Sequence, residues 1–130
     1  MESDLGVFEI PYNIALLIVI FGHFFFAYTQ WFKWPELAEK LTELRGEEIV
    51  KTASLGRSFA SYNLSIGLGL LLSLLFYDST TIQGVVLALI SLTALVGASG
   101  TKGMTILLLR FLPALIALGL LVAGLLLFGT

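Results

Sequence analysis

The chain contains no cysteine, a single histidine and few charged side chains. Without cysteine it has no disulfide, no thiolate nucleophile and no ligands for an iron–sulfur cluster. Charged residues make up 12% of the 130 positions and hydrophobic residues 58%, which leaves too little polar surface to cover a soluble globule. The same composition excludes a disordered chain, and a net charge of −2 without a basic run excludes nucleic acid as a partner. We therefore expect one membrane domain over residues 1–130, with the lipid bilayer around it.

Four hydrophobic segments are long enough to cross a bilayer, whose core of about 30 Å requires roughly 20 apolar residues per helix. They cover approximately residues 12–34, 57–77, 81–100 and 104–128. The short turns between spans two and three and between spans three and four make the helices that they join antiparallel. The sequence thus predicts an all-α membrane protein built as a four-transmembrane-helix antiparallel bundle.

The connection between spans one and two has an amphipathic pattern. Leu37, Leu41 and Leu44 recur at helical spacing, and Pro35 suits the first turn of a helix. We expect a short interfacial helix over about residues 36–45.

Basic residues are distributed unevenly among the connections. Six of the seven lie at the ends of the first and third connections: Lys33, Lys40, Arg45, Lys51, Arg57 and Lys102. Loops rich in lysine and arginine stay on the cytoplasmic side of a membrane. This bias predicts that both termini face outside.

Small side chains recur every four residues along span two. Close helix contact in lipid depends on small residues, because lipid tails give helices no hydrophobic reason to associate. We expect this face to form a tight contact, either within the chain or between subunits of a homo-oligomer or larger membrane complex. Its members are Ser61, Ser65, Gly69 and Ser73.

Arg110 lies about two turns into span four, where each charged residue adds about 2.5–3.5 kcal/mol to the cost of membrane insertion. No acidic residue lies within any span to pair with it. One interpretation is that the long side chain reaches the headgroups, helped by the carbonyl that Pro113 frees in the preceding turn. The other is an anion-binding residue that faces the interior of the bundle.

Other polar residues come to a similar depth in the cytoplasmic third of the bundle if the helices are antiparallel. His23 lies near the middle of span one, either as a packed neutral imidazole or as part of a site. We interpret it as a member of one candidate binding cluster with Gln30, Asn63, Ser99 and Arg110.

Signatures of catalysis and of metal binding are missing from the sequence. A single histidine without an intramembrane carboxylate falls short of the three or four ligands of a metal site, so we expect no metal and no cofactor within one chain. A haem or metal shared between identical subunits stays open. The chain has no phosphate-binding glycine loop, no Ser-His-Asp set and no paired carboxylates.

These features resemble the small four-span bacterial membrane proteins of the DUF1304 family. His23 matches a histidine of that family, Trp31 or Trp34 fits its aromatic segment, and Gln30 stands where the family has a glutamate. Span two keeps the family's Tyr-Asn pair and a later glycine, whereas span four has Arg110 in place of a glutamine before Pro-Ala. The corresponding residues are Tyr62, Asn63, Gly69, Gly97, Gly100, Arg110, Pro113 and Ala114. The resemblance implies a bacterial plasma membrane and no settled activity.

The sequence is also similar to the membrane-associated eicosanoid and glutathione metabolism family, through Arg57 and Asn63 of span two. Two hypotheses follow. The first is a non-enzymatic bundle, either an accessory subunit or a carrier of a small hydrophobic or anionic ligand. The second is a transferase for a lipophilic substrate, with an anionic thiol cosubstrate held by Arg57 and Arg110. The lack of an activated nucleophile favours the first.

Overall fold

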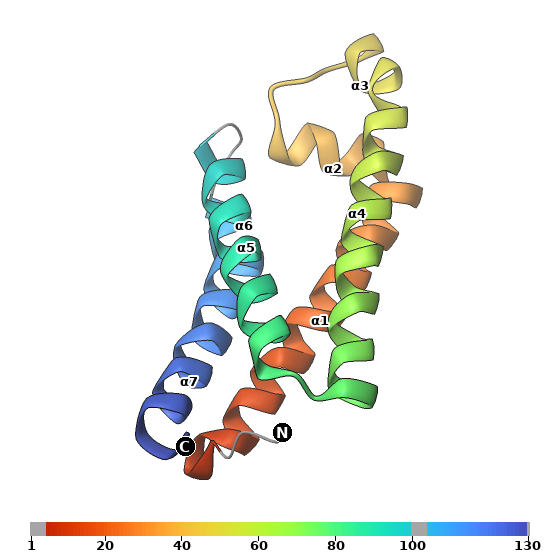
Figure 1. Ribbon diagram of the computed structural model, residues 1–130. Coiled ribbons are helices and arrows are strands. Elements are labelled where there is room, and N and C mark those ends of the chain that lie inside the picture. Colours follow the sequence, from red (N-terminus) through yellow and green to blue (C-terminus); the bar gives the residue numbers. More distant parts are fainter. Residues whose placement is uncertain (1–4, 100–103, 130) are drawn as a thin grey trace.

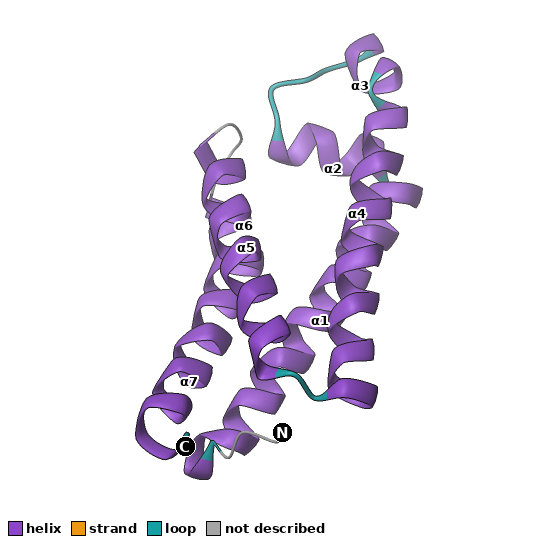
Figure 2. Ribbon diagram, in the orientation of Figure 1, coloured by secondary structure: helices purple, strands orange, loops and turns teal. Residues whose placement is uncertain are grey.

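A computed structural model describes residues 5–99 and 104–129, which form helices with no strand among them (Figures 1 and 2). The four long helical segments are apolar enough to cross a membrane, so the protein is an all-α membrane bundle, as predicted. The described elements are η1 (Gly6–Phe8), α1 (Glu9–Phe32), α2 (Trp34–Leu41), α3 (Glu47–Lys51), α4 (Ala53–Leu72), η2 (Ser73–Tyr77), α5 (Thr80–Ser99), α6 (Met104–Ile106), η3 (Leu107–Phe111) and α7 (Leu112–Phe128). The predicted turn at 101–103, with Lys102, and Gly100 lie outside the described residues.

The spans are arranged as two pairs of helices. Helix α1 packs against α4, and α5 packs against α7 and η3. Contact between α1 and α7 joins the two pairs. Figure 1 shows the pairs close together near the termini and further apart toward α2 and α3.

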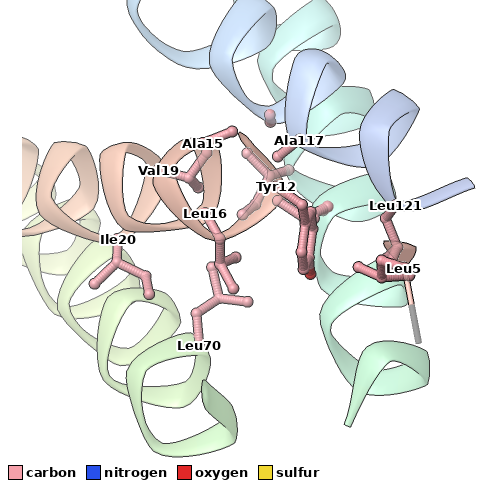
Figure 3. Close-up of a cluster of buried hydrophobic side chains, with 12 residues drawn as sticks. Leu5, Tyr12, Ala15, Leu16, Val19, Ile20, Leu70, Ala117 and Leu121 are labelled. Carbon is pink, nitrogen blue, oxygen red and sulfur yellow. The ribbon is translucent and has the colours of Figure 1, made fainter. Parts of the chain in front are cut away.

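The hydrophobic core lies at the end of the bundle where the pairs meet. Side chains of α1, α4 and α7 converge there, among them Leu16, Leu70 and Leu121, each at most 2% exposed (Figure 3). Large apolar side chains cover the outside instead, such as Ile18 and Phe21, which are 57% and 63% exposed. Such a surface is stable in contact with lipid tails, which agrees with a membrane-embedded bundle.

A buried polar network that sequence reasoning missed joins three elements at this end. The Tyr12 hydroxyl of α1 donates a hydrogen bond of 2.6 Å to Oε1 of Gln83 on α5. The Gln83 amide in turn donates to Oγ of Ser73 at 3.3 Å. Because all three side chains are buried, their polar groups cannot form hydrogen bonds with water, and these bonds satisfy them instead.

Helix α4 packs within the chain through a different face from the predicted one. Ser61, Ser65 and Gly69 are exposed, and the two serine hydroxyls bond to backbone carbonyls of their own helix. Of the predicted four, Ser73 is buried. The buried residues of α4 are Gly56, Ala60, Asn63, Gly67 and Leu70. A contact of the exposed face with another chain stays a prediction.

The predicted interfacial helix is present as α2, but it ends at Leu41 because Thr42 adopts an extended conformation. Trp34 begins the helix, packs with Ala38 and Ile49, and donates a hydrogen bond of 3.1 Å from Nε1 to Thr52 Oγ1. These contacts fix α2 to the start of α4. Its other side faces the space between the two helix pairs, where the candidate site lies.

Candidate functional site

Arg110 lies in a widened turn of the fourth span. The turn η3 is a π-helix, and it ends where the amide of Leu112 bonds to the carbonyl of Leu107, five residues back. Pro113 follows and has no N–H for an α-helical bond to Leu109, which favours a local change in the bonding pattern. Single π turns within α-helices are frequent at functional sites.

The Arg110 side chain is half-buried and lacks a partner. Its Nε has no hydrogen-bond acceptor in the described part of the chain, and no ion pair within residues 5–99 and 104–129 includes it. A charge at membrane depth costs free energy unless an anion, water or headgroup compensates it. The fold therefore leaves the cationic side chain of Arg110 without a compensating group in the part of the chain that the structure describes.

Two cavities flank Arg110. The larger, of about 530 Å³, lies between α2, α4 and α5, and the smaller, of about 280 Å³, lies between α1, α2 and the α6–η3 segment. The residues common to both walls are Gln30, Leu37, Leu41, Ile106 and Arg110. Arg110 thus forms part of the partition and is accessible to a molecule in either cavity.

A hydrogen-bonded amide pair borders the larger cavity. Nδ2 of Asn63, which is 2% exposed, donates to Oε1 of Gln30 at 2.6 Å and ties α4 to α1. The other amide atom of Asn63, Oδ1, is buried without a partner. Gln30 and Asn63 are therefore held in place by each other and supply a polar end to a mostly apolar cavity.

His23 lies close to this site but outside the cavity walls. Its Nδ1 bonds to the carbonyl of Val19 at 2.8 Å, which makes Nδ1 the protonated nitrogen and leaves Nε2 as an acceptor. Nε2 is buried without a partner. The imidazole packs edge-on against the ring of Phe26, which lines the smaller cavity.

The structure brings together three of the five predicted site residues on the cavity walls, namely Gln30, Asn63 and Arg110. Ser99 is exposed, and its hydroxyl bonds to the carbonyl of Val96 at 2.6 Å, so it does not join them. Arg57 is also exposed and absent from both walls, so the structure does not bring it together with Arg110 there, and the site for a thiol cosubstrate stays a prediction. Among the residues that the structure describes, no three acidic or histidine side chains gather to hold a metal.

Sequence reasoning missed three charged residues of the smaller cavity: Lys33, Glu36 and Lys40. Their spacing of three and four positions places them on one side of α2, together with the start of that helix. The amphipathic pattern contained this signal. By itself the pattern predicts a helix at the membrane interface, because the sequence does not show that span four lies opposite this side of α2.

Residues 17–122 match the model of a family described as a protein of unknown function, DUF1304. The chain belongs to the DUF1304 family. The match covers the second and third spans in full and most of the first and fourth, and it includes His23, Gln30, Asn63 and Arg110. It confirms the resemblance seen in the sequence. No curated protein and no solved structure matches the chain.

Proposed function

We propose that this integral membrane protein binds a small amphiphile with an anionic group beside Arg110 and acts as a non-enzymatic carrier or binding subunit. The observation that carries the proposal is an arginine at membrane depth, without a partner in the described chain, on the shared wall of two cavities. Arginine presents several donors to a carboxylate or phosphate in a fixed geometry, which suits an anionic group.

The surroundings of Arg110 support an amphiphile rather than a small inorganic ion. Apolar and aromatic side chains of α2 and α4, such as Leu37, Phe59 and Ile66, dominate the larger cavity. Gln30 and Asn63 are among the few polar groups that can orient a ligand in this mostly apolar pocket. An anion next to Arg110 compensates its charge, while an apolar tail fills the space between α4 and α5.

Snorkelling alone accounts for the depth of Arg110 but not for its position in the wall of two cavities. A snorkelling arginine extends toward the headgroups and needs no cavity beside it. Gln30 and Asn63 lie in the same cavity wall as Arg110, which agrees better with a binding role.

The test compares Arg110→Gln with Arg57→Gln. Both remove one arginine charge, but Arg57 is exposed and lies outside the cavity walls. We expect Arg110→Gln to reduce the anionic lipids that copurify in detergent by about tenfold, the effect of losing one charge-assisted hydrogen bond. Native mass spectrometry of the purified protein, followed by extraction of the bound lipids, measures this. Equal amounts in wild type and Arg110→Gln would contradict the proposal.

We also propose that the end of the bundle with α2 and α3 is cytoplasmic and that both termini are outside, in a bacterial plasma membrane. The bias of basic residues toward the first connection supports this orientation. The chain has no cysteine, so single cysteines at Glu43, after α2, and at Ser79, between η2 and α5, can be labelled without background. A membrane-impermeant maleimide should label Ser79→Cys in intact cells and Glu43→Cys only after permeabilisation. Labelling of Glu43→Cys in intact cells would overturn the orientation.

A further inference from the structure

The smaller cavity has an excess of positive charge in its wall. Lys33, Lys40 and Arg110 contribute three cations, and Glu36 contributes the one carboxylate. The two lysines are exposed, whereas Arg110 is half-buried. A group bound here would therefore meet exposed donors along α2 and its start and a half-buried donor from η3 at the same time.

The larger cavity has Arg110 as its one charged wall residue and is otherwise mostly apolar. Tyr62 on α4 and Thr93 on α5 belong to its wall and are exposed, so the cavity is open to the surface of the bundle between these helices. Figure 1 shows α4 and α5 diverging from the turn that joins them. An apolar chain can therefore lie partly in the cavity and partly in the membrane.

We propose that the ligand is a lipid phosphomonoester, with its phosphate in the smaller cavity among Lys33, Lys40 and Arg110 and its tail in the larger one. This inference rests on the proposed function and names the class of ligand. A phosphomonoester carries about −1.5 to −2 charges at pH 7 and three acceptor oxygens, which match three cations better than the single charge of a carboxylate does. The shared position of Arg110 places head and tail on opposite sides of one residue.

Three probes separate the contributions of head and tail in a titration followed by native mass spectrometry. Oleoyl lysophosphatidic acid has the phosphomonoester and the tail, oleate has a similar tail with one charge, and glycerol phosphate has the headgroup alone. We expect wild type to bind lysophosphatidic acid roughly tenfold more tightly than oleate, because of the additional charge-assisted hydrogen bonds. Glycerol phosphate should bind at least about 100-fold more weakly, since it buries no apolar chain.

The double variant Lys33→Gln/Lys40→Gln tests the headgroup site, with Lys51→Gln as a control on α3 outside both walls. The double variant should lose most of the roughly tenfold preference for lysophosphatidic acid over oleate and keep its affinity for oleate. Lys51→Gln should behave as wild type. Thermal melting of each variant verifies that the exposed substitutions leave the fold intact.

The outcomes distinguish this inference from the proposed function. If Arg110→Gln weakens both lipids while the double lysine variant changes neither, the binding function stands and the phosphomonoester assignment is wrong. Equal affinity of wild type for lysophosphatidic acid and oleate would also overturn the assignment. If glycerol phosphate binds as tightly as lysophosphatidic acid, the ligand is a soluble phosphate, and the proposal that it is a lipid is wrong. If Arg110→Gln affects neither lipid, both proposals fail.

Discussion

Replacing Gly67 with leucine is expected to lower the free energy of unfolding in detergent by about 1–3 kcal/mol, by analogy with overpacked cores. A Cβ atom at position 67 would lie 2.7 Å from Cε1 of Phe24, at the contact between α4 and α1. The additional atoms of leucine would force Phe24 or the helix itself to move. Thermal or denaturant unfolding of the purified protein measures the loss.

The matched control is the same substitution at Gly69, two residues along the same helix. A Cβ at position 69 meets no atom within 4 Å, so Gly69→Leu is expected to change stability by less than about 0.5 kcal/mol. Equal losses at both positions would contradict the observed packing face of α4. If Gly69→Leu instead changes the oligomeric state in native mass spectrometry, the exposed face with Ser61 and Ser65 forms a contact between chains.

Gln83→Leu is expected to destabilise the bundle by about 1–3 kcal/mol, the cost of leaving a buried polar group without a partner. The substitution removes both hydrogen bonds of Gln83 and leaves the hydroxyl of Tyr12 buried among apolar side chains. The leucine side chain has a similar size, so the loss measures the polar network more than the packing. Unfolding of Gln83→Leu against wild type tests the effect.

A double-mutant cycle with Tyr12→Phe separates the hydrogen bond from other effects of the substitution. Tyr12→Phe removes the hydroxyl that Gln83→Leu leaves unpaired, so Tyr12→Phe/Gln83→Leu should lose less stability than the sum of the single variants. Strict additivity would show that the Tyr12–Gln83 bond contributes no coupling. Double-mutant cycles give hydrogen bonds between membrane helices an average coupling free energy of about 0.6 kcal/mol. We expect the Tyr12–Gln83 coupling free energy to be at least of this size.

The four spans and the helix between the first two follow from the sequence alone. Apolar length is a local property, and it can be compared directly with the thickness of a bilayer. The amphipathic pattern around Leu37 and Leu41 is equally local. The boundaries still shifted: α2 ends at Leu41 rather than near residue 45, because an extended Thr42 breaks the helix.

Part of the candidate site can also be predicted from the sequence, because the depth of a residue follows from its position along a span. Counting residues along antiparallel helices predicts the depth of each polar side chain in the membrane. This count predicts one level for Gln30, Asn63 and Arg110, and the structure places all three in the wall of one cavity. Depth does not give the direction in which a side chain points. Ser99 shares the level but lies on the exposed side of α5, and the charged side of α2 was not assigned to the site.

The tertiary structure alone decided how each helix is rotated about its axis. Each residue turns an α-helix by about 100°, so Gly67 and Gly69 lie on nearly opposite faces of α4. Small residues occur on both faces and give the sequence no basis for choosing between them. Packing against α1 decides which glycine is buried, because the ring of Phe24 on α1 lies against Gly67. In span four, the π turn inserts an additional residue before Pro113 and so changes the direction of Arg110 relative to a regular helix. Sequence thus determined what crosses the membrane, whereas packing between helices determined which side chains meet inside it.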